Sequence, residues 1–67
     1  MPSDAARARE ILGVPADASL EVCAQAFTAR FEALKPRLVA AHAEERSDAL
    51  EAWAVLTAAW EAVAAAD

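Results

Sequence analysis

The sequence has few of the residues that interrupt helices or favour sheets. Its 67 residues include one glycine, three prolines, no tyrosine and two phenylalanines. Alanine, leucine, glutamate and arginine dominate instead, and these are strong helix formers, whereas β-branched residues are few. We therefore expect an all-α protein. The length predicts a single domain, residues 1–67 with a core at about residues 4–63, and is also compatible with one module of a longer protein.

Positive charge is also scarce. Six lysines and arginines face eleven acidic residues, which gives a formal net charge of −5. The excess of acidic residues is spread along the chain. Residues 1–34 contain three basic and five acidic residues, and residues 35–67 contain three basic and six acidic residues. Neither half offers the basic surface that nucleic acids or anionic membranes require, so we expect neither as a partner.

Three further absences narrow the class of protein. Cys23 is the one cysteine, so no disulfide can form within the chain. The first ten residues mix acids with bases and lack the apolar stretch of a secretory signal. No uninterrupted apolar run approaches the roughly 20 residues that span a bilayer. The resulting expectation is a cytoplasmic protein that does not enter the membrane.

The first predicted helix is short and runs from Ala5 to Leu12. Ser3 is a favourable N-cap residue, Gly13 suits the position that follows a helix, and Pro15 prevents continuation. About two turns of helix are not stable alone in water. We therefore expect this helix to lie across the rest of the fold.

Two longer helices are predicted to form an antiparallel hairpin. Ser19 is the expected N-cap of the second helix, which should run from Leu20 to about Leu34 and end at Lys35-Pro36, because the residue before a proline disfavours the α conformation. The third helix begins near Pro36 or only near Ala43, and its apolar residues then recur at helical spacing toward the end of the chain. The apolar faces predict a core of Leu12, Cys23, Phe27, Phe31, Leu34, Leu50, Trp53 and Leu56.

Two stretches resemble a known family. The sequence ILGVPADAS at residues 11–19 is similar to the end of the first helix and the connector of a J-domain, the co-chaperone module that acts on Hsp70, and Ala26-Phe27 follows at the family's spacing. The sequence AWAVLT at residues 52–57 resembles the family's aromatic anchor in its third helix. The resemblance covers roughly residues 5–60 and implies a small three-helix J-like fold.

The tripeptide that defines the family is altered. Counting from Ser19 places the family's His-Pro-Asp, which lies in the loop after the second helix, on Lys35-Pro36-Arg37. The proline is kept, whereas the histidine is a lysine and the aspartate is an arginine. An acceptor-only carboxylate has become a donor-only guanidinium, so stimulation of Hsp70 ATP hydrolysis, which the family's motif requires, is not expected.

The second helix also departs from the family. J-domains carry lysines and arginines along the exposed face of this helix, where they meet an acidic surface of Hsp70. The corresponding positions here are uncharged, and they are Ala24, Gln25, Thr28, Ala29 and Ala33. An acidic domain without this basic row should not be steered toward an acidic partner, so Hsp70 is not expected to bind. Arg30 stands where the family has a core leucine, and its stem could pack while its head reaches solvent.

Residues with reactive or ligating side chains are few. Cys23 lies on the apolar face of the second helix and is expected to be a buried hydrophobe, and His42 is expected on the surface. The acidic residues Glu44, Glu45, Asp48 and Glu51 should form a solvated face or a docking face for a basic partner. No nucleotide-binding loop, catalytic triad or metal-ligand spacing is present, so we expect no enzyme, no cofactor and no metal site.

The function predicted from the sequence is therefore protein binding. The leading hypothesis is a J-like interaction module that does not stimulate Hsp70, with a J-protein or a second copy of itself among the conceivable partners. The alternatives are a self-associating or scaffold module of a larger assembly and a divergent Hsp70 co-chaperone. The candidate partner-binding residues are Ala24, Gln25, Thr28, Ala29 and Trp60.

Overall fold

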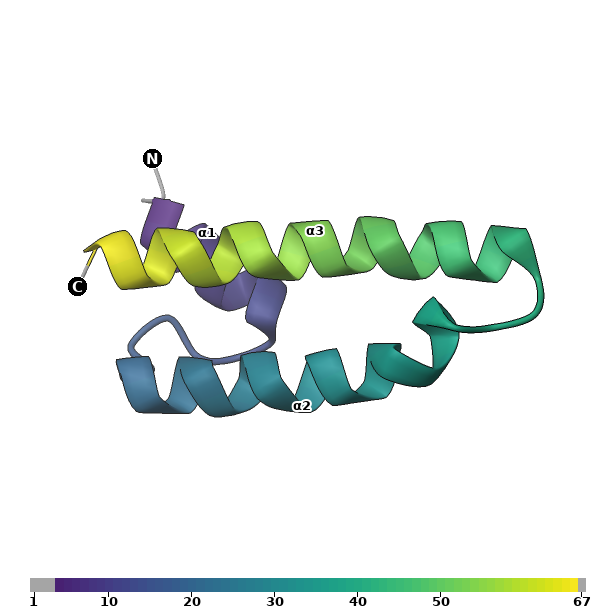
Figure 1. The fold of residues 1–67 in the computed structure, drawn as a ribbon. Coiled ribbons are helices and arrows are strands. Elements are labelled where there is room, and N and C mark those ends of the chain that lie inside the picture. The colour runs from purple at the N-terminus through teal and green to yellow at the C-terminus, as the bar shows by residue number, and fades with distance from the viewer. Residues whose placement is uncertain (1–3, 67) are drawn as a thin grey trace.

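The computed structural model of the chain describes residues 4–66 as three helices joined by two short connectors (Figure 1). These are α1 (Asp4–Leu12), α2 (Leu20–Leu38) and α3 (Ala43–Ala66). The all-α prediction is confirmed, since the described residues contain no strand. Helices α2 and α3 run antiparallel as a hairpin, and α1 crosses behind α3 in Figure 1 and packs chiefly against it.

The ends of the helices follow from local sequence. At the end of α1, Gly13 adopts a φ of 77°, its N–H donates to the Glu10 carbonyl, and the N–H of Val14 donates to the Arg9 carbonyl, both at 3.0 Å. This pair of hydrogen bonds is a Schellman motif, which needs the left-handed conformation that glycine adopts freely. The predicted N-cap at Ser3 lies outside the described residues.

The second predicted N-cap is confirmed. The hydroxyl oxygen of Ser19 accepts a hydrogen bond of 3.2 Å from the N–H of Val22, and Leu20 begins α2. This hydroxyl pairs one of the amide groups that the first turn of a helix leaves without a partner.

The prediction that Lys35-Pro36 ends the second helix is wrong. Helix α2 continues through Pro36 to Leu38, and Val39 is its C-cap. A proline inside a helix removes one N–H donor and crowds the carbonyl four residues earlier, so continuation through Pro36 requires other stabilising contacts. Leu38 packs against the core, which stabilises the last turn of α2. Of the two predicted starts of the third helix, near Pro36 and near Ala43, the structure confirms Ala43.

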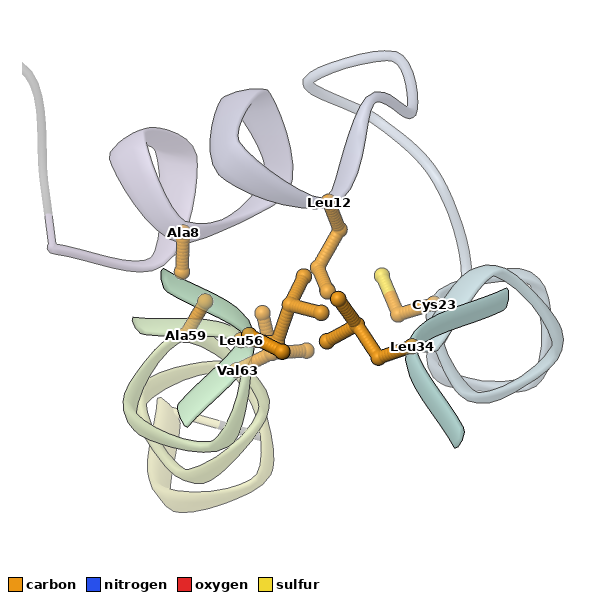
Figure 2. Packing of buried hydrophobic residues seen from close by; sticks show 8 residues of the cluster. Ala8, Leu12, Cys23, Leu34, Leu56, Ala59 and Val63 are labelled. Carbon is orange, nitrogen blue, oxygen red and sulfur yellow. The ribbon is translucent and has the colours of Figure 1, made fainter. Parts of the chain in front are cut away.

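The core lies where the three helices meet, and small residues are frequent in it (Figure 2). Its buried members are Ala8, Leu12, Cys23, Leu34, Ala49, Leu56, Ala59 and Val63. Figure 2 shows Ala8 of α1 beside Ala59 of α3, where two methyl side chains allow the helix backbones to approach closely. Interaxial distance between packed helices depends on the size of the side chains at the contact.

The predicted core is correct in part. Leu12, Cys23, Leu34 and Leu56 are buried, whereas Phe27 and Phe31 are only partly buried. The core placement of Leu50 and Trp53 is wrong, since their exposed fractions are 55% and 39%. The reason is that α3 buries a different face from the one predicted. Alanines at positions 49, 52 and 59 belong to the buried face, and Leu50 and Trp53 lie to one side of it.

Helix α3 is long and apolar enough to cross a membrane by length and composition alone. Its 24 residues include an 18-residue window of mean hydropathy 1.3. Core helices of soluble proteins meet the same criterion, and the buried stripe of α3 packs against α1 and α2. Of that 18-residue window, 22% is buried among residues 4–66.

Candidate functional site

The two connectors are held by arginine side chains. Arg9 of α1 donates from Nε to the Ala18 carbonyl at 2.9 Å, at the far end of the first connector. Arg30 of α2 donates from Nε to the Leu12 carbonyl at 2.9 Å, at the last residue of α1. Arg46 of α3 donates to the Ala40 carbonyl at 2.6 Å in the second connector. Three of the six basic side chains thus bind connector or helix-end carbonyls.

The side chain of Arg30 reaches from α2 to the end of α1. Its stem leaves the hairpin and its guanidinium lies over Gly13, where a Cβ would contact it. The charged head therefore pairs with a carbonyl that the end of α1 leaves without an intrahelical donor. Arg30 thus joins α2 to the end of α1 by a hydrogen bond, and Gly13 is required both for its φ and for the space that Arg30 occupies.

One flank of the hairpin carries four aromatic rings in a continuous row. The ring centroids of Trp60 and Phe27 are 6.0 Å apart, those of Phe27 and Phe31 are 6.3 Å apart, and those of Phe31 and Trp53 are 6.3 Å apart. These separations fall in the range of favourable aromatic pairs. We call these four residues, together with the exposed Leu50, the aromatic face.

A polar atom lies without a partner beside the aromatic face. The hydroxyl oxygen of Thr57 is buried and has no hydrogen-bond partner among the described residues. Thr57 lies four residues after Trp53 and three before Trp60, so all three share one side of α3. Burial of an unpaired hydroxyl costs free energy, so this position is not optimised for stability.

The tripeptide Lys35-Pro36-Arg37 lies in the last turns of α2 and not in a loop. The Nζ atom of Lys35 is 3.0 Å from a carboxylate oxygen of Glu32 and 5.5 Å from the centre of the Phe31 ring. Arg37 is 3.9 Å from a carboxylate oxygen of Glu45 on α3. The side chains on both sides of Pro36 are thus directed to neighbours within the hairpin.

The candidate partner-binding residues of α2 do not share one side. Ala24 and Thr28 border the aromatic face, since they lie on the same side of α2 as Phe31 at helical spacing, whereas Ala29 lies on the opposite flank. Gln25, Thr28 and Ala29 are exposed, and Ala24 is half-buried. Trp60 is partly buried against the core and stacks on Phe27. The predicted set is therefore divided between two surfaces.

The other flank of the hairpin contains an open groove of about 930 Å³ between α2 and α3. Ile11, in the last turn of α1, is one of its lining residues. Ala33 and Leu34 of α2 and Ala52 and Val55 of α3 supply apolar lining. Charged side chains also line it, with Arg30 and Arg37 on α2 and Asp48 and Glu51 on α3.

Cys23 and His42 lie in different elements, Cys23 in α2 and His42 in the second connector. Cys23 is fully buried and His42 is exposed in the second connector, and neither lines the groove. The described residues contain no group of three or more histidine, cysteine or carboxylate side chains that could hold a metal ion. The acidic residues Glu44, Glu45, Asp48 and Glu51 are exposed, as a solvated or docking face requires.

Comparisons with protein-family models, with curated proteins and with solved structures find no match for this chain. The site is therefore interpreted from its own residues.

Sequence reasoning missed the groove and the exposure of the aromatic face. A signal for the groove exists in the sequence, because Asp48, Glu51 and Val55 are spaced three and four apart on one side of α3. The roles of Arg9 and Arg46 had no sequence signal, since a basic residue near a helix end is equally compatible with a solvated side chain.

Proposed function

We propose that this chain is a J-like protein-interaction module that does not stimulate the ATPase of Hsp70. The sequence resemblance supports the J-like part of the proposal, and the fold of α1 followed by an α2–α3 hairpin is compatible with it. The cytoplasm is the proposed location.

The observation that carries the proposal is the placement of Lys35-Pro36-Arg37 inside α2. The family holds the corresponding tripeptide in a loop, where its side chains are free to meet a partner. Here Lys35 pairs with Glu32, and Arg37 is directed toward Glu45. Both the chemistry and the backbone setting of the activating motif differ, which argues against Hsp70 stimulation.

The positions of α2 that correspond to the family's basic row support the same conclusion. Ala24, Gln25, Thr28 and Ala29 carry no charge, and the chain as a whole carries a net charge of −5. An acidic surface of Hsp70 would be repelled by the domain and would find no basic row to oppose it.

The aromatic face supports a protein partner of another kind. Leu50 and Trp53 are 55% and 39% exposed, and Trp53 is joined through ring contacts to the partly buried Phe31. Tryptophan is among the residues that contribute most to binding at protein interfaces, particularly when apolar neighbours surround it. This face is a candidate site for partner binding.

An ATPase assay tests the proposal. Purified Hsp70 is mixed with the domain, and a true J-domain is the positive control. We expect no increase over the basal rate of ATP hydrolysis. Stimulation comparable to the control that is lost in Lys35→Ala or Arg37→Ala would overturn the proposal and identify a divergent co-chaperone.

A variant with the family's His-Pro-Asp tripeptide restored tests whether the tripeptide alone determines Hsp70 stimulation. The variant Lys35→His/Arg37→Asp rebuilds the family's tripeptide at the same positions. We expect it to remain inactive, because α2 still lacks the basic row and continues through Pro36. Activation of this variant would show that the tripeptide alone had been lost and that the rest of the surface still fits Hsp70.

Self-association is a second candidate function, favoured by the low charge of the aromatic face. The interior of this face consists of Phe27, Phe31, Trp53, Trp60 and Leu50, which are all uncharged, so two copies could meet there despite the net charge of each chain. Sedimentation equilibrium of the wild type and of Leu50→Glu measures this. A dimer that dissociates in the variant supports self-association, whereas a wild-type monomer at all concentrations contradicts it.

A further inference from the structure

Helix α1 is too short to cover the hairpin against which it packs. It has 9 residues, whereas α2 and α3 have 19 and 24. At a rise of about 1.5 Å per residue, α1 is roughly 13 Å long and α3 roughly 36 Å. One part of the hairpin flank is therefore covered by α1, and the part that extends toward the second connector is not (Figure 1).

The groove occupies this uncovered part. Ile11, in the last turn of α1, lines it together with residues of α2 and α3, so the groove adjoins the end of α1. Ile11 and Val55 are 39% and 52% exposed, which leaves apolar side chains open to solvent along the groove. Ala33 and Ala52 on the two opposing helices are small, so an added helix could approach closely.

The charges along the groove differ between its two sides, with arginines on α2 and carboxylates on α3. Asp48 and Glu51 line it from α3, and neither forms an ion pair among residues 4–66. On α2, Arg30 donates to the Leu12 carbonyl, and Arg37 is directed toward Glu45. The α3 side of the groove thus presents carboxylates without basic partners, in a chain of net charge −5.

We propose that this groove binds an amphipathic helix of another protein, with apolar residues toward Val55 and lysines or arginines along the edge that meets Asp48 and Glu51. The helix would extend the row begun by α1 and complete a four-helix arrangement. Helix-in-groove binding uses an apolar face at helical spacing, with flanking charges that set orientation. This inference rests on the proposed role of the chain as a protein-interaction module.

Other occupants fit the groove less well. A second copy would bring a net charge of −5 to an acidic edge, and a nucleic acid would be repelled in the same way. A small molecule is better held in an enclosed pocket, whereas this groove is open along its length. An amphipathic helix with basic residues along the edge that faces α3 satisfies both the exposed apolar lining and the unpaired carboxylates.

A peptide library supplies the probe. Helical peptides carry fixed leucines along one face, and the positions on both edges of that face are randomised between lysine and glutamate. Selection against the immobilised domain should enrich lysine along one edge. Nuclear magnetic resonance shifts on adding the enriched peptide should be largest at Ile11, Ala52 and Val55.

Matched variants locate the binding site. The double variant Asp48→Lys/Glu51→Lys should bind the enriched peptide about tenfold more weakly, because two rim attractions become repulsions. The control Glu61→Lys changes an exposed acid of the same helix outside the groove and should bind within about twofold of the wild type. Val55→Asp should abolish binding, whereas Leu50→Asp, at a similarly exposed position on the aromatic face, should not.

The outcomes separate this inference from the proposed function. Enrichment without an edge preference, or binding lost in Leu50→Asp and kept in Val55→Asp, would overturn the groove and leave a protein-binding module with a different surface. Failure of every peptide to bind would also overturn the groove inference. A domain that stimulates Hsp70 would instead overturn the proposed function, whatever the peptides show.

Discussion

The two flanks of the α2–α3 hairpin are stabilised by different means. On one flank the four rings of the aromatic face pack against one another, and Phe27 and Trp60 also pack against the core. On the other flank, α1 is joined to α3 by small buried side chains and to α2 by the hydrogen bond from Arg30. The first flank therefore depends on area buried between rings, and the second on close packing and a few directed polar contacts.

This difference decides how each flank should respond to substitution. Ring contacts at a partly exposed surface are individually modest and tolerate small displacements. A closely packed helix interface tolerates little change in volume, because the structure relaxes only partly around a cavity. The α1 side should therefore be the more sensitive to mutation, although the aromatic face contains the larger side chains.

The largest expected effect is that of Leu12→Ala. Leu12 is 1% exposed and lies between α1 and the hairpin (Figure 2), so its removal should lower the free energy of unfolding by about 3 kcal/mol. The neighbouring Ile11→Ala is the control, since Ile11 is 39% exposed and should cost less than about 1 kcal/mol. Thermal and urea unfolding measure both, and equal losses would contradict the assignment of the core.

A smaller effect is expected for Arg30→Ala. The substitution removes the hydrogen bond to the Leu12 carbonyl and should cost about 1 kcal/mol in stability. Arg7→Ala, which removes the same charge from an exposed position on α1, should change stability by less than about 0.5 kcal/mol. Hydrogen exchange at α1 gives a second measurement, and unchanged protection there in Arg30→Ala would show that this contact does not hold the helix.

An effect comparable in size to that of Arg30→Ala, but of opposite sign, is expected for Thr57→Val. The substitution replaces an unpaired buried hydroxyl by a methyl group of similar size, so it should raise the free energy of unfolding by about 1 kcal/mol. Urea unfolding measures the change, with Thr28→Val as the exposed control of the same type. A loss of stability in Thr57→Val would indicate that the hydroxyl has a partner after all.

Much of the fold could be predicted from the residues at the helix ends. Gly13 and Ser19 have strong local preferences that tertiary packing does not override, so the end of α1 and the start of α2 were predicted correctly. Pro36 disfavours helix because it lacks the N–H that would pair with the carbonyl four residues earlier, yet α2 continues through it. The stabilising contact is Leu38 against the core, and it depends on tertiary structure that the local sequence does not specify.

The candidate site was less predictable, for a reason visible in α3. Several residues there are apolar, and their sizes favour a core stripe through Leu50 and Trp53. The structure instead places the stripe through Ala49, Leu56, Ala59 and Val63, and Ala59 lies beside Ala8 of α1 (Figure 2). The sequence does not distinguish an alanine at a close helix contact from an alanine in solvent. Neither the exposed aromatic rings nor the groove could therefore be predicted from it.

The packing of α1 on α3 also has a consequence for the order of folding. The hairpin joins α2 and α3 through a short connector at residues 39–42, so its closure is local, whereas α1 meets a helix that is distant in the chain. Closing a longer loop costs more chain entropy, and contacts of large sequence separation slow folding. The hairpin should therefore form first and α1 should dock last, which makes the first helix of the chain the last to acquire its native neighbours.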